Sequence, residues 1–234
     1  MAKTKVTFKL GGPVIMQALS RFNPLDGIVA YAAVERYKLS RSGETITDED
    51  IIAITDNLPF KKIATSADYI YACSIPSFDC ELPYQGRAGR RYDHSGSVTL
   101  HKMISTERLS KFGIPMDYII AGVRKGYIAS GSGPYKTAMP MLYPMLARSV
   151  SWVFDGDRAA VSDLLADITH VGKKAALGYG RILDKIYEDT DDDIVRMLPA
   201  TDYVVSDPVY LARPRPAYWM ADGKVIMGLG KLLS

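Results

Sequence analysis

Cysteine, histidine and long apolar runs are all scarce in this sequence of 234 residues. The two cysteines, Cys73 and Cys80, match neither the spacing of a zinc pair nor that of a thioredoxin-type motif, so we read both as ordinary reduced thiols. No uninterrupted apolar run approaches the roughly 20 residues that a membrane-spanning helix needs, and Met1–Lys5 lacks the apolar centre of a secretory signal. We therefore expect a cytoplasmic protein without a membrane partner.

Groups suited to acid–base or metal chemistry are also few. The histidines are His94, His101 and His170, and general acid–base catalysis near neutral pH most often uses histidine. The acidic clusters do not resemble metal sites, because Asp48–Asp50 has the pattern of a capped helix start and Glu188–Asp193 that of a solvated loop. We predict no metal and no cofactor.

The charge is small in sum but uneven along the chain. The formal net charge is +3. Because the run Glu188–Asp193 holds five acidic residues, the remainder of the chain carries a net charge of about +8. A basic remainder of this kind suits an acidic partner such as nucleic acid.

Hydrophobic residues make up 47% of the sequence, enough to fill the core of a single domain covering residues 1–234. The sequence contains neither an internal repeat nor a low-complexity linker. Its hydrophobic periodicity predicts the order strand, helix, strands, helix, strand. The strands are expected near residues 6–10, 62–75, 97–105, 149–154 and 181–187, and the helices near 24–38, with Asn23 as cap and Pro24 in the first turn, and 158–170.

This order predicts the α+β fold class, with a ferredoxin-like (RRM-like) βαββαβ core in which two helices cover one face of an antiparallel sheet. Residues from about 60 to 136 are too many for a simple connection, so we expect an inserted β-hairpin, or thumb, in that region. The prolines after residue 200 indicate an irregular C-terminal strap over about 200–234, closed by a short hairpin at Ala221–Lys224.

A basic glycine-rich segment separates the last predicted helix from the last predicted strand. Glycines let a backbone approach a ligand closely, cations pair with phosphates, and a tyrosine offers a stacking face. The glycine spacing is not that of a Walker loop, so nucleotide hydrolysis is unsupported. Two interpretations stay open: a cradle for a phosphate backbone, or a helix C-cap followed by a tight turn. The candidate residues are Gly172, Lys173, Lys174, Gly178, Tyr179, Gly180 and Arg181.

A second basic segment lies within the predicted insertion. Its arginines alternate with glycines and are flanked by tyrosines, which combines phosphate pairing with base stacking on a loop. The alternative is a solvated, arginine-rich hairpin tip. The candidate residues are Tyr84, Arg87, Arg90, Arg91, Tyr92, His94 and Lys102.

Three segments resemble the RAMP proteins, the ferredoxin-like subunits of CRISPR effector complexes. Gly172–Arg181 resembles their glycine-rich loop, which likewise lies between the last helix and the last strand. Pro24–Tyr31 resembles the opening of helix one in the type IV subunit that caps the 5′ handle of the guide RNA, and Arg215–Trp219 is similar to its C-terminal Pro-Tyr-Trp element. The last match departs from the pattern at Ala217, where a second proline is expected.

The resemblance implies a non-catalytic RNA-binding subunit that clamps the 5′ handle of the crRNA with its glycine loop and thumb. The implied partners are the crRNA, the backbone and large subunits of the complex, and target DNA near the PAM. Some relatives cut precursor crRNA instead, which leaves a metal-independent endoribonuclease as the alternative. Its candidate catalytic residues are His94 and His170, whereas His101 falls inside a predicted strand and reads as structural.

Overall fold

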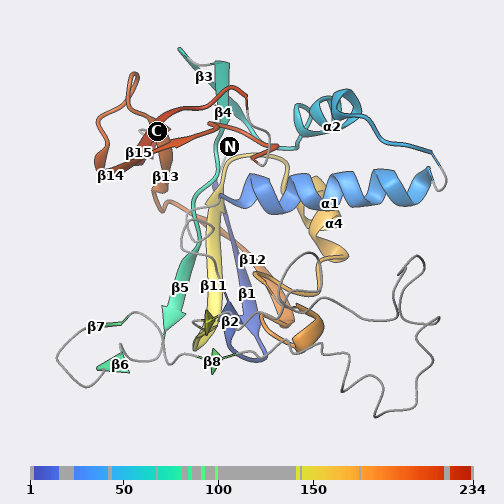
Figure 1. The fold of residues 1–234 in the computed structure, drawn as a ribbon, viewed down its shortest axis with the longest axis vertical. Coiled ribbons are helices and arrows are strands. Elements are labelled where there is room, and N and C mark those ends of the chain that lie inside the picture. The colour runs from blue at the N-terminus through green and yellow to red at the C-terminus, as the bar shows by residue number, and fades with distance from the viewer. Residues whose placement is uncertain are drawn as a thin grey trace, which may run out of the picture.

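The structure is a computed structural model of the chain (Figure 1). It describes residues 3–15, 24–41, 44–66, 68–80, 84–85, 91–92, 98–99, 141–142, 144–173, 175–218 and 222–232. The helices are α1 (Leu25–Ser40), α2 (Asp48–Thr55), α4 (Arg158–Ala166) and the 3-10 turn η3 (Ala175–Leu177). The strands are β1 (Lys3–Leu10), β2 (Val14–Ile15), β3 (Lys62–Thr65), β4 (Asp68–Tyr71), β5 (Ser77–Cys80), β6 (Tyr84–Gln85), β7 (Arg91–Tyr92), β8 (Val98–Thr99), β9 (Met141–Leu142), β10 (Pro144–Met145), β11 (Ala147–Phe154), β12 (Ile182–Thr190), β13 (Ile194–Pro199), β14 (Ser206–Ala212) and β15 (Val225–Leu232).

The largest sheet has four strands in the order β12-β1-β11-β5, and every neighbouring pair is antiparallel. Helix α1 connects β1 to the segment that leads to β5, and α4 connects β11 to β12 (Figure 1). In β1, Val6 lies opposite Trp152 on one side and Tyr187 on the other. The predicted mixed α+β class with antiparallel sheets is confirmed.

Both helices cover the same face of this sheet because alternate residues of β1 point toward them. Val6 and Phe8 are fully buried and share one core with Val29 of α1 and Leu165 of α4. The ring centroids of Phe8 and Trp152 are 5.1 Å apart, a separation at which aromatic rings pack well. This core packs α1 and α4 against the sheet.

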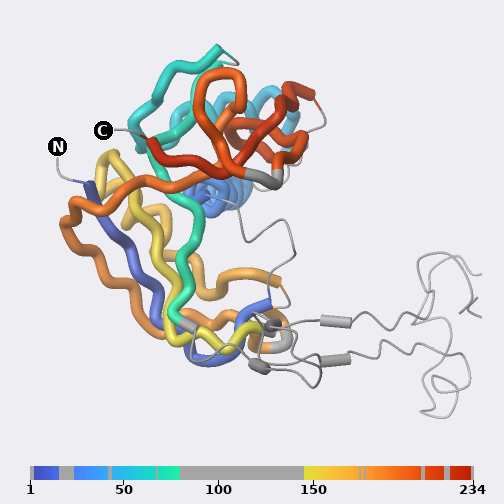
Figure 2. The backbone as a smooth tube through the Cα atoms, turned by 90° about the vertical axis from the view of Figure 1, so that its left-hand side faces the viewer, coloured from blue at the N-terminus to red at the C-terminus, as the bar shows by residue number. Residues whose placement is uncertain are grey.

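A second, smaller core lies on the opposite face of β11. Val153, whose neighbours in the strand face the first core, packs there with Ile70, Ile194, Leu198 and other apolar residues. These residues come from β4 and from the C-terminal sheet, whose strand order is β13-β15-β14. Figures 1 and 2 show this sheet at the end of β11 near the start of α1, well away from the end where β1 runs into β2.

The C-terminal region corrects one prediction. Residues 200–234 were expected to form an irregular strap, but Ser206–Ala212 and Val225–Leu232 are strands of a three-stranded antiparallel sheet. Prolines misled the sequence interpretation, because Pro208 lies in β14, an edge strand, where a missing N–H is tolerated. The Ala221–Lys224 turn does fall between the paired strands β14 and β15, although Ala221 itself lies outside the described residues.

The predicted strand over 62–75 is a hairpin of two short strands, β3 and β4, in which Lys62 lies opposite Tyr71. Residues 77–80, assigned by sequence to the insertion, form β5, the edge strand of the main sheet. The acidic run is also not a simple loop, because Glu188–Thr190 continue β12 opposite β1. The expected strand over 97–105 is described only at Val98–Thr99, which pairs with β9.

The helix ends follow local chemistry. Thr47 and Asp50 form a capping box at the start of α2, as the acidic cluster indicated. Asp157 caps α4 by accepting from the N–H groups of Ala159 and Ala160. Pro24 is the N-cap of α1 rather than part of its first turn, and Asn23 lies outside the described residues. Across the described ranges, the helices are all too short or too polar to cross a bilayer.

Candidate nucleic-acid interface

The glycine-rich segment forms a lobe that is held by its backbone. The N–H of Gly180 donates to Pro13 O at 2.9 Å, and the N–H of Lys173 donates to Ile15 O at 2.7 Å. His170 and Arg181 form an isolated antiparallel bridge at the base of the lobe. The lobe is therefore docked on the turn that follows β1, at one end of the main sheet.

The glycines of this lobe have different structural roles. Gly172, Gly178 and Gly180 all have positive φ, at 85°, 83° and 66°. A Cβ added to Gly180 would lie 1.8 Å from Val171 O, so this position needs glycine for packing. Around Gly178 an added Cβ would meet nothing within 4 Å, so there is space for a close approach on that side. The N–H of Gly178 itself donates to Ala175 O at 2.8 Å.

These observations bear on both interpretations of the segment. Helix α4 ends at Ala166 with Asp167 as its C-cap, so Gly172 is not the helix C-cap that the alternative required. The tight-turn part of the alternative does account for Gly180. The open space at Gly178 suits a close approach, but the N–H groups of Lys173, Gly178 and Gly180 are already hydrogen-bonded within the protein. Phosphate contacts at this lobe would therefore be made mainly by its cationic side chains.

The side chains of the lobe leave positive charge on the surface. Lys173 and Arg181 are exposed and Tyr179 is half-buried. Among the residues that the structure describes, Lys173 and Arg181 form no ion pair with a carboxylate. Both cations can therefore meet a phosphate without first breaking an internal pair. Lys174 lies outside the described residues.

A pocket lies beside the lobe, between α1 and the segment that follows α4. His170, half-buried, lines it, and its Nδ1 lies 2.9 Å from Thr169 Oγ1. Tyr31 of α1 lines the same pocket and is 55% exposed, a large fraction for an aromatic ring. The pocket also takes in Gly27, Ile28, Asp167, Ile168, Val171, Gly172, Ala175 and Tyr218. Sequence reasoning singled out His170 but missed Tyr31 as a site residue, although Tyr31 stands in the segment that carried the resemblance.

The second predicted segment is described only in part. Tyr84 pairs with Tyr92 and Gln85 with Arg91, so β6 and β7 form an antiparallel pair around the arginine-rich stretch. Arg87, Arg90, His94 and Lys102 lie outside the described residues. The pair follows β5, which runs antiparallel to β11, and the glycine lobe precedes β12.

The two segments leave the main sheet at the same end. Strand β5 is parallel to β1, and β12 is antiparallel to β1. The last residue of β5 and the first residue of β12 therefore lie at the same end of the sheet. They belong to opposite outer strands, which puts about 14 Å of sheet between them. A single nucleic-acid strand can reach across such a distance.

The sheet face that points away from the helices has no stacking platform. Its residues on β1, β11 and β5 include Lys5, Thr7, Ser149, Ser151 and Ser77, as the register shows. RRM domains bind bases with aromatic residues on the corresponding kind of face. Because the described residues of this face include no aromatic side chain, the loops at the end of the sheet are the better candidates for base contacts.

Tyr218 connects the C-terminal segment to α1. Its hydroxyl donates to Asp26 Oδ1 at 2.7 Å, and its ring lies where a Cβ on Gly27 would approach to 3.3 Å. Arg196, 1% exposed, lies 3.5 Å from the other carboxylate oxygen of Asp26 and donates to Pro214 O at 3.1 Å. Burial raises the pKa of Asp26, and the guanidinium of Arg196 opposes that rise. This buried cluster ties β13 and the segment 213–218 to the first turn of α1.

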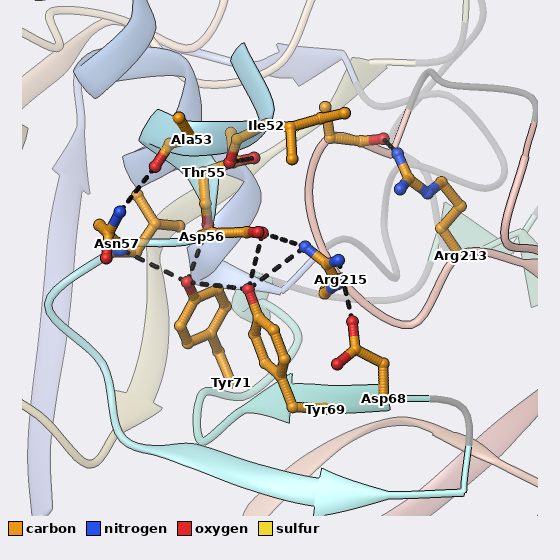
Figure 3. A network of polar contacts seen from close by, with 12 residues as sticks. Ile52, Ala53, Thr55, Asp56, Asn57, Asp68, Tyr69, Tyr71, Arg213 and Arg215 are labelled. Carbon is orange, nitrogen blue, oxygen red and sulfur yellow. Dashed lines mark hydrogen bonds and ion pairs between the residues drawn. The ribbon is translucent and has the colours of Figure 1, made fainter. Parts of the chain in front are cut away.

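A second polar network holds the same segment from the other side (Figure 3). The guanidinium of Arg215 contacts Asp56 at the end of α2, and its other nitrogen lies 2.9 Å from Asp68. It also lies 4.7 Å from the ring centroid of Tyr69, whose hydroxyl donates to Asp56 at 2.8 Å. Figure 3 shows Tyr71 beside Tyr69, donating to Thr55 O at 2.8 Å. Sequence reasoning noted the segment but not these partners, which are far apart along the chain.

The acidic run is largely neutralised by its neighbours. Asp192 pairs with Lys5 at 3.2 Å, and Asp193 pairs with Lys231 at 2.8 Å. Hydrogen bonds from these lysines lower the pKa of each carboxyl group. Lys5 and Lys231 are therefore paired with the acidic run. Both lysines are included in the net charge of about +8 for the remainder of the chain, so the unpaired basic surface is smaller than that number suggests.

The cysteines and the possible metal ligands are described in part. Cys73 is a buried free thiol, and burial raises its pKa, so it stays protonated and unreactive. Within the described ranges, no three His, Cys, Asp or Glu side chains are grouped to hold a metal ion.

The fold and the site together define a class: an antiparallel α+β protein with an exposed, cationic glycine lobe. The family model of CRISPR type IV associated protein Csf3 matches residues 2–228. The chain belongs to this family, and is thus a type IV CRISPR-associated protein.

Comparison with solved structures finds a crystal structure of a CRISPR protein from Archaeoglobus fulgidus, 14% identical. The match covers 100% of this chain and 87% of that chain, with a TM-score of 0.34. No curated protein matches the sequence.

Proposed function

We propose that this chain is a non-catalytic RNA-binding subunit of a type IV CRISPR effector complex that clamps the 5′ handle of the crRNA. The observation that carries the proposal is the glycine lobe, which exposes Lys173 and Arg181 and leaves open space at Gly178, beside a pocket containing Tyr31. Cations, room for a close approach and an aromatic ring are the components of a sequence-tolerant RNA site. Membership of a type IV CRISPR-associated family supports RNA as the proposed ligand of this site.

The core is proposed to be a ferredoxin-like RAMP domain. Its main sheet has the order β12-β1-β11-β5, with α1 and α2 between the first two sheet strands along the chain and α4 between the last two. This strand order and the places of α1 and α4 match the split βαβ arrangement, which supports the proposal. The second and third sheet strands, β5 and β11, are separated along the chain by β6 to β10 and the proposed thumb. The glycine lobe then lies between the last helix and the last strand, the place that RAMP proteins give to their glycine-rich loop.

The first test removes the two exposed cations of the lobe. The double substitution Lys173→Glu and Arg181→Glu should greatly weaken binding of crRNA handle, measured by fluorescence anisotropy, and leave the thermal unfolding midpoint unchanged. A matched control is Lys38→Glu with Arg41→Glu, which makes the same charge change at the far end of α1, about 24 Å from its start. Equal loss in both variants would point to general charge repulsion and contradict a specific lobe site.

The thumb is tested separately. Replacing Arg87, Arg90 and Arg91 together with alanine should abolish handle capture without unfolding the protein, since these positions are proposed to contact phosphates rather than the core. Unchanged RNA affinity in this variant would remove the thumb from the mechanism. The other proposed partners, target DNA near the PAM and the backbone and large subunits, are tested by co-purification with the genomic neighbours.

An endoribonuclease role has one observation in its favour, the half-buried His170 in the pocket beside the lobe. Under the proposal, labelled repeat RNA incubated with the protein in chelator should stay intact and bound. Specific cleavage that is lost on His170→Ala or His94→Ala would establish the enzyme instead.

A further inference from the structure

The C-terminal sheet carries a second pocket that none of the predicted site residues explains. It lies between β13, β14 and β15 and the segment that follows β14. Its lining residues are Pro24, Arg196, Met197, Tyr210, Leu211, Ala212, Arg213, Pro214, Tyr218, Lys224 and Met227. Apolar side chains form most of this lining, and three cations are placed among them.

The charge of this pocket is not balanced from within. Arg213 is only 8% exposed, and its NH1 donates to Ala217 O at 2.7 Å. In the described part of the chain, neither Arg213 nor the exposed Lys224 forms an ion pair with a carboxylate. Of the three cations only Arg196 does, through Asp26. Burying a charged group without a counter-ion is costly, so an anionic ligand would stabilise this arrangement.

The second pocket adjoins the pocket of the glycine lobe. Tyr218 lines both, so its side chain is a wall that the two share. Its position is fixed by the hydroxyl's bond to Asp26 and by the contact of its ring with the Gly27 position. Pro24, which precedes α1, lines the second pocket, and Gly27 in the first turn of α1 lines the pocket of the lobe, so the two pockets lie next to each other at the start of α1.

We propose that this second pocket binds one nucleotide of a single strand, with the base against Tyr210, Met197 and Met227 and the phosphate at Lys224 and Arg213. The inference rests on the proposed function, because it extends the same strand beyond the lobe. An apolar floor with a cationic rim matches a nucleotide, which joins an aromatic base to an anionic phosphate. The strand can be the crRNA itself or target DNA beside the guide.

Tyr210 allows a matched pair of variants. Tyr210→Ala removes the ring and should weaken binding of handle RNA of about 16 nucleotides by roughly 5- to 150-fold, the loss expected for one stacked base. Tyr210→Phe keeps the ring and should bind as the unchanged protein does. RNA of about 8 nucleotides that fills only the lobe should bind all three proteins equally. Equal binding of the longer RNA to Tyr210→Ala would overturn the inference.

Photocrosslinking identifies the strand. The full chain is irradiated with 4-thiouridine RNA, alone or with 4-thiothymidine target DNA, and the attached peptides are identified by mass spectrometry. Attachment of RNA at Tyr210 or Met227 supports the crRNA as source, and attachment of DNA there supports the target strand. Crosslinks at the lobe but none in the second pocket would overturn this inference and leave the proposed function intact. Crosslinks at neither site, with no RNA binding, would overturn both this inference and the proposed function. If the second pocket is protected only by another subunit, the pocket belongs to a protein interface and the inference is also overturned.

Discussion

Two glycines of one lobe show how the same residue type can serve packing at one position and access at another. Gly178 and Gly180 both have positive φ, yet only Gly180 is in contact with backbone where a side chain would stand. The sequence alone could not separate them, because the distinction depends on Val171 and Val14, which the fold brings to Gly180. Positive φ costs an L-residue about 1–2 kcal/mol, and a backbone clash adds to that cost.

The pair gives a prediction at the scale of single residues. Gly180→Ala should lower the free energy of unfolding by about 3 kcal/mol or more, because strain and the overlap with Val171 O act together. Gly178→Ala should cost only about 1–2 kcal/mol, since its surroundings are open. Urea unfolding followed by circular dichroism measures both values. Equal costs would mean that Gly180 is not packed against Val171 O as described.

At the scale of elements, the segment 213–218 is ordered by side chains from elsewhere rather than by its own secondary structure. Arg215 reaches α2 and β4, and Tyr218 reaches α1, so one short stretch holds three elements together. The sequence resemblance pointed to this segment, and the structure supplies its physical basis. Its partners could not be predicted, because buried polar pairs such as Asp26–Arg196 leave no periodic signal in the sequence.

Arg215 is the position at which this linkage can be tested. Arg215→Ala should destabilise the protein by about 1–3 kcal/mol, because it removes charged hydrogen bonds to Asp56 and Asp68 together with the contact over Tyr69. Arg215→Lys should recover only part of this loss, since an ammonium group cannot pair with two carboxylates in the fork geometry of a guanidinium. Hydrogen exchange should rise in 213–218 in the alanine variant. Exchange that rises evenly over the whole chain would contradict a local anchoring role.

For the whole molecule, strand alternation and helical spacing predicted the main elements, because β1, β11, α1 and α4 each bury one regular face. The C-terminal sheet was missed, since β14 contains proline, β15 contains glycine, and β15 pairs with both β13 and β14 in a way that the sequence pattern does not reveal. The charge estimate also failed in part. The acidic run is paired with Lys5 and Lys231, two lysines distant from it in sequence.

The proposal that the lobe and the thumb hold one strand makes a prediction about salt. For single-stranded nucleic acid, the slope of log K against log salt changes by about 0.7 for each phosphate contact. Replacing Lys173 and Arg181 should therefore reduce the slope by about 1.4, and replacing Arg87, Arg90 and Arg91 by about 2.1. Combining all five substitutions should give nearly the sum of these reductions, as measured by titration at several low salt concentrations, at which the residual binding of the variants can still be detected. The unchanged protein should bind one RNA. Two RNA molecules bound per protein, each lost with a different set of substitutions, would show that the segments at the two outer strands of the sheet bind separate strands.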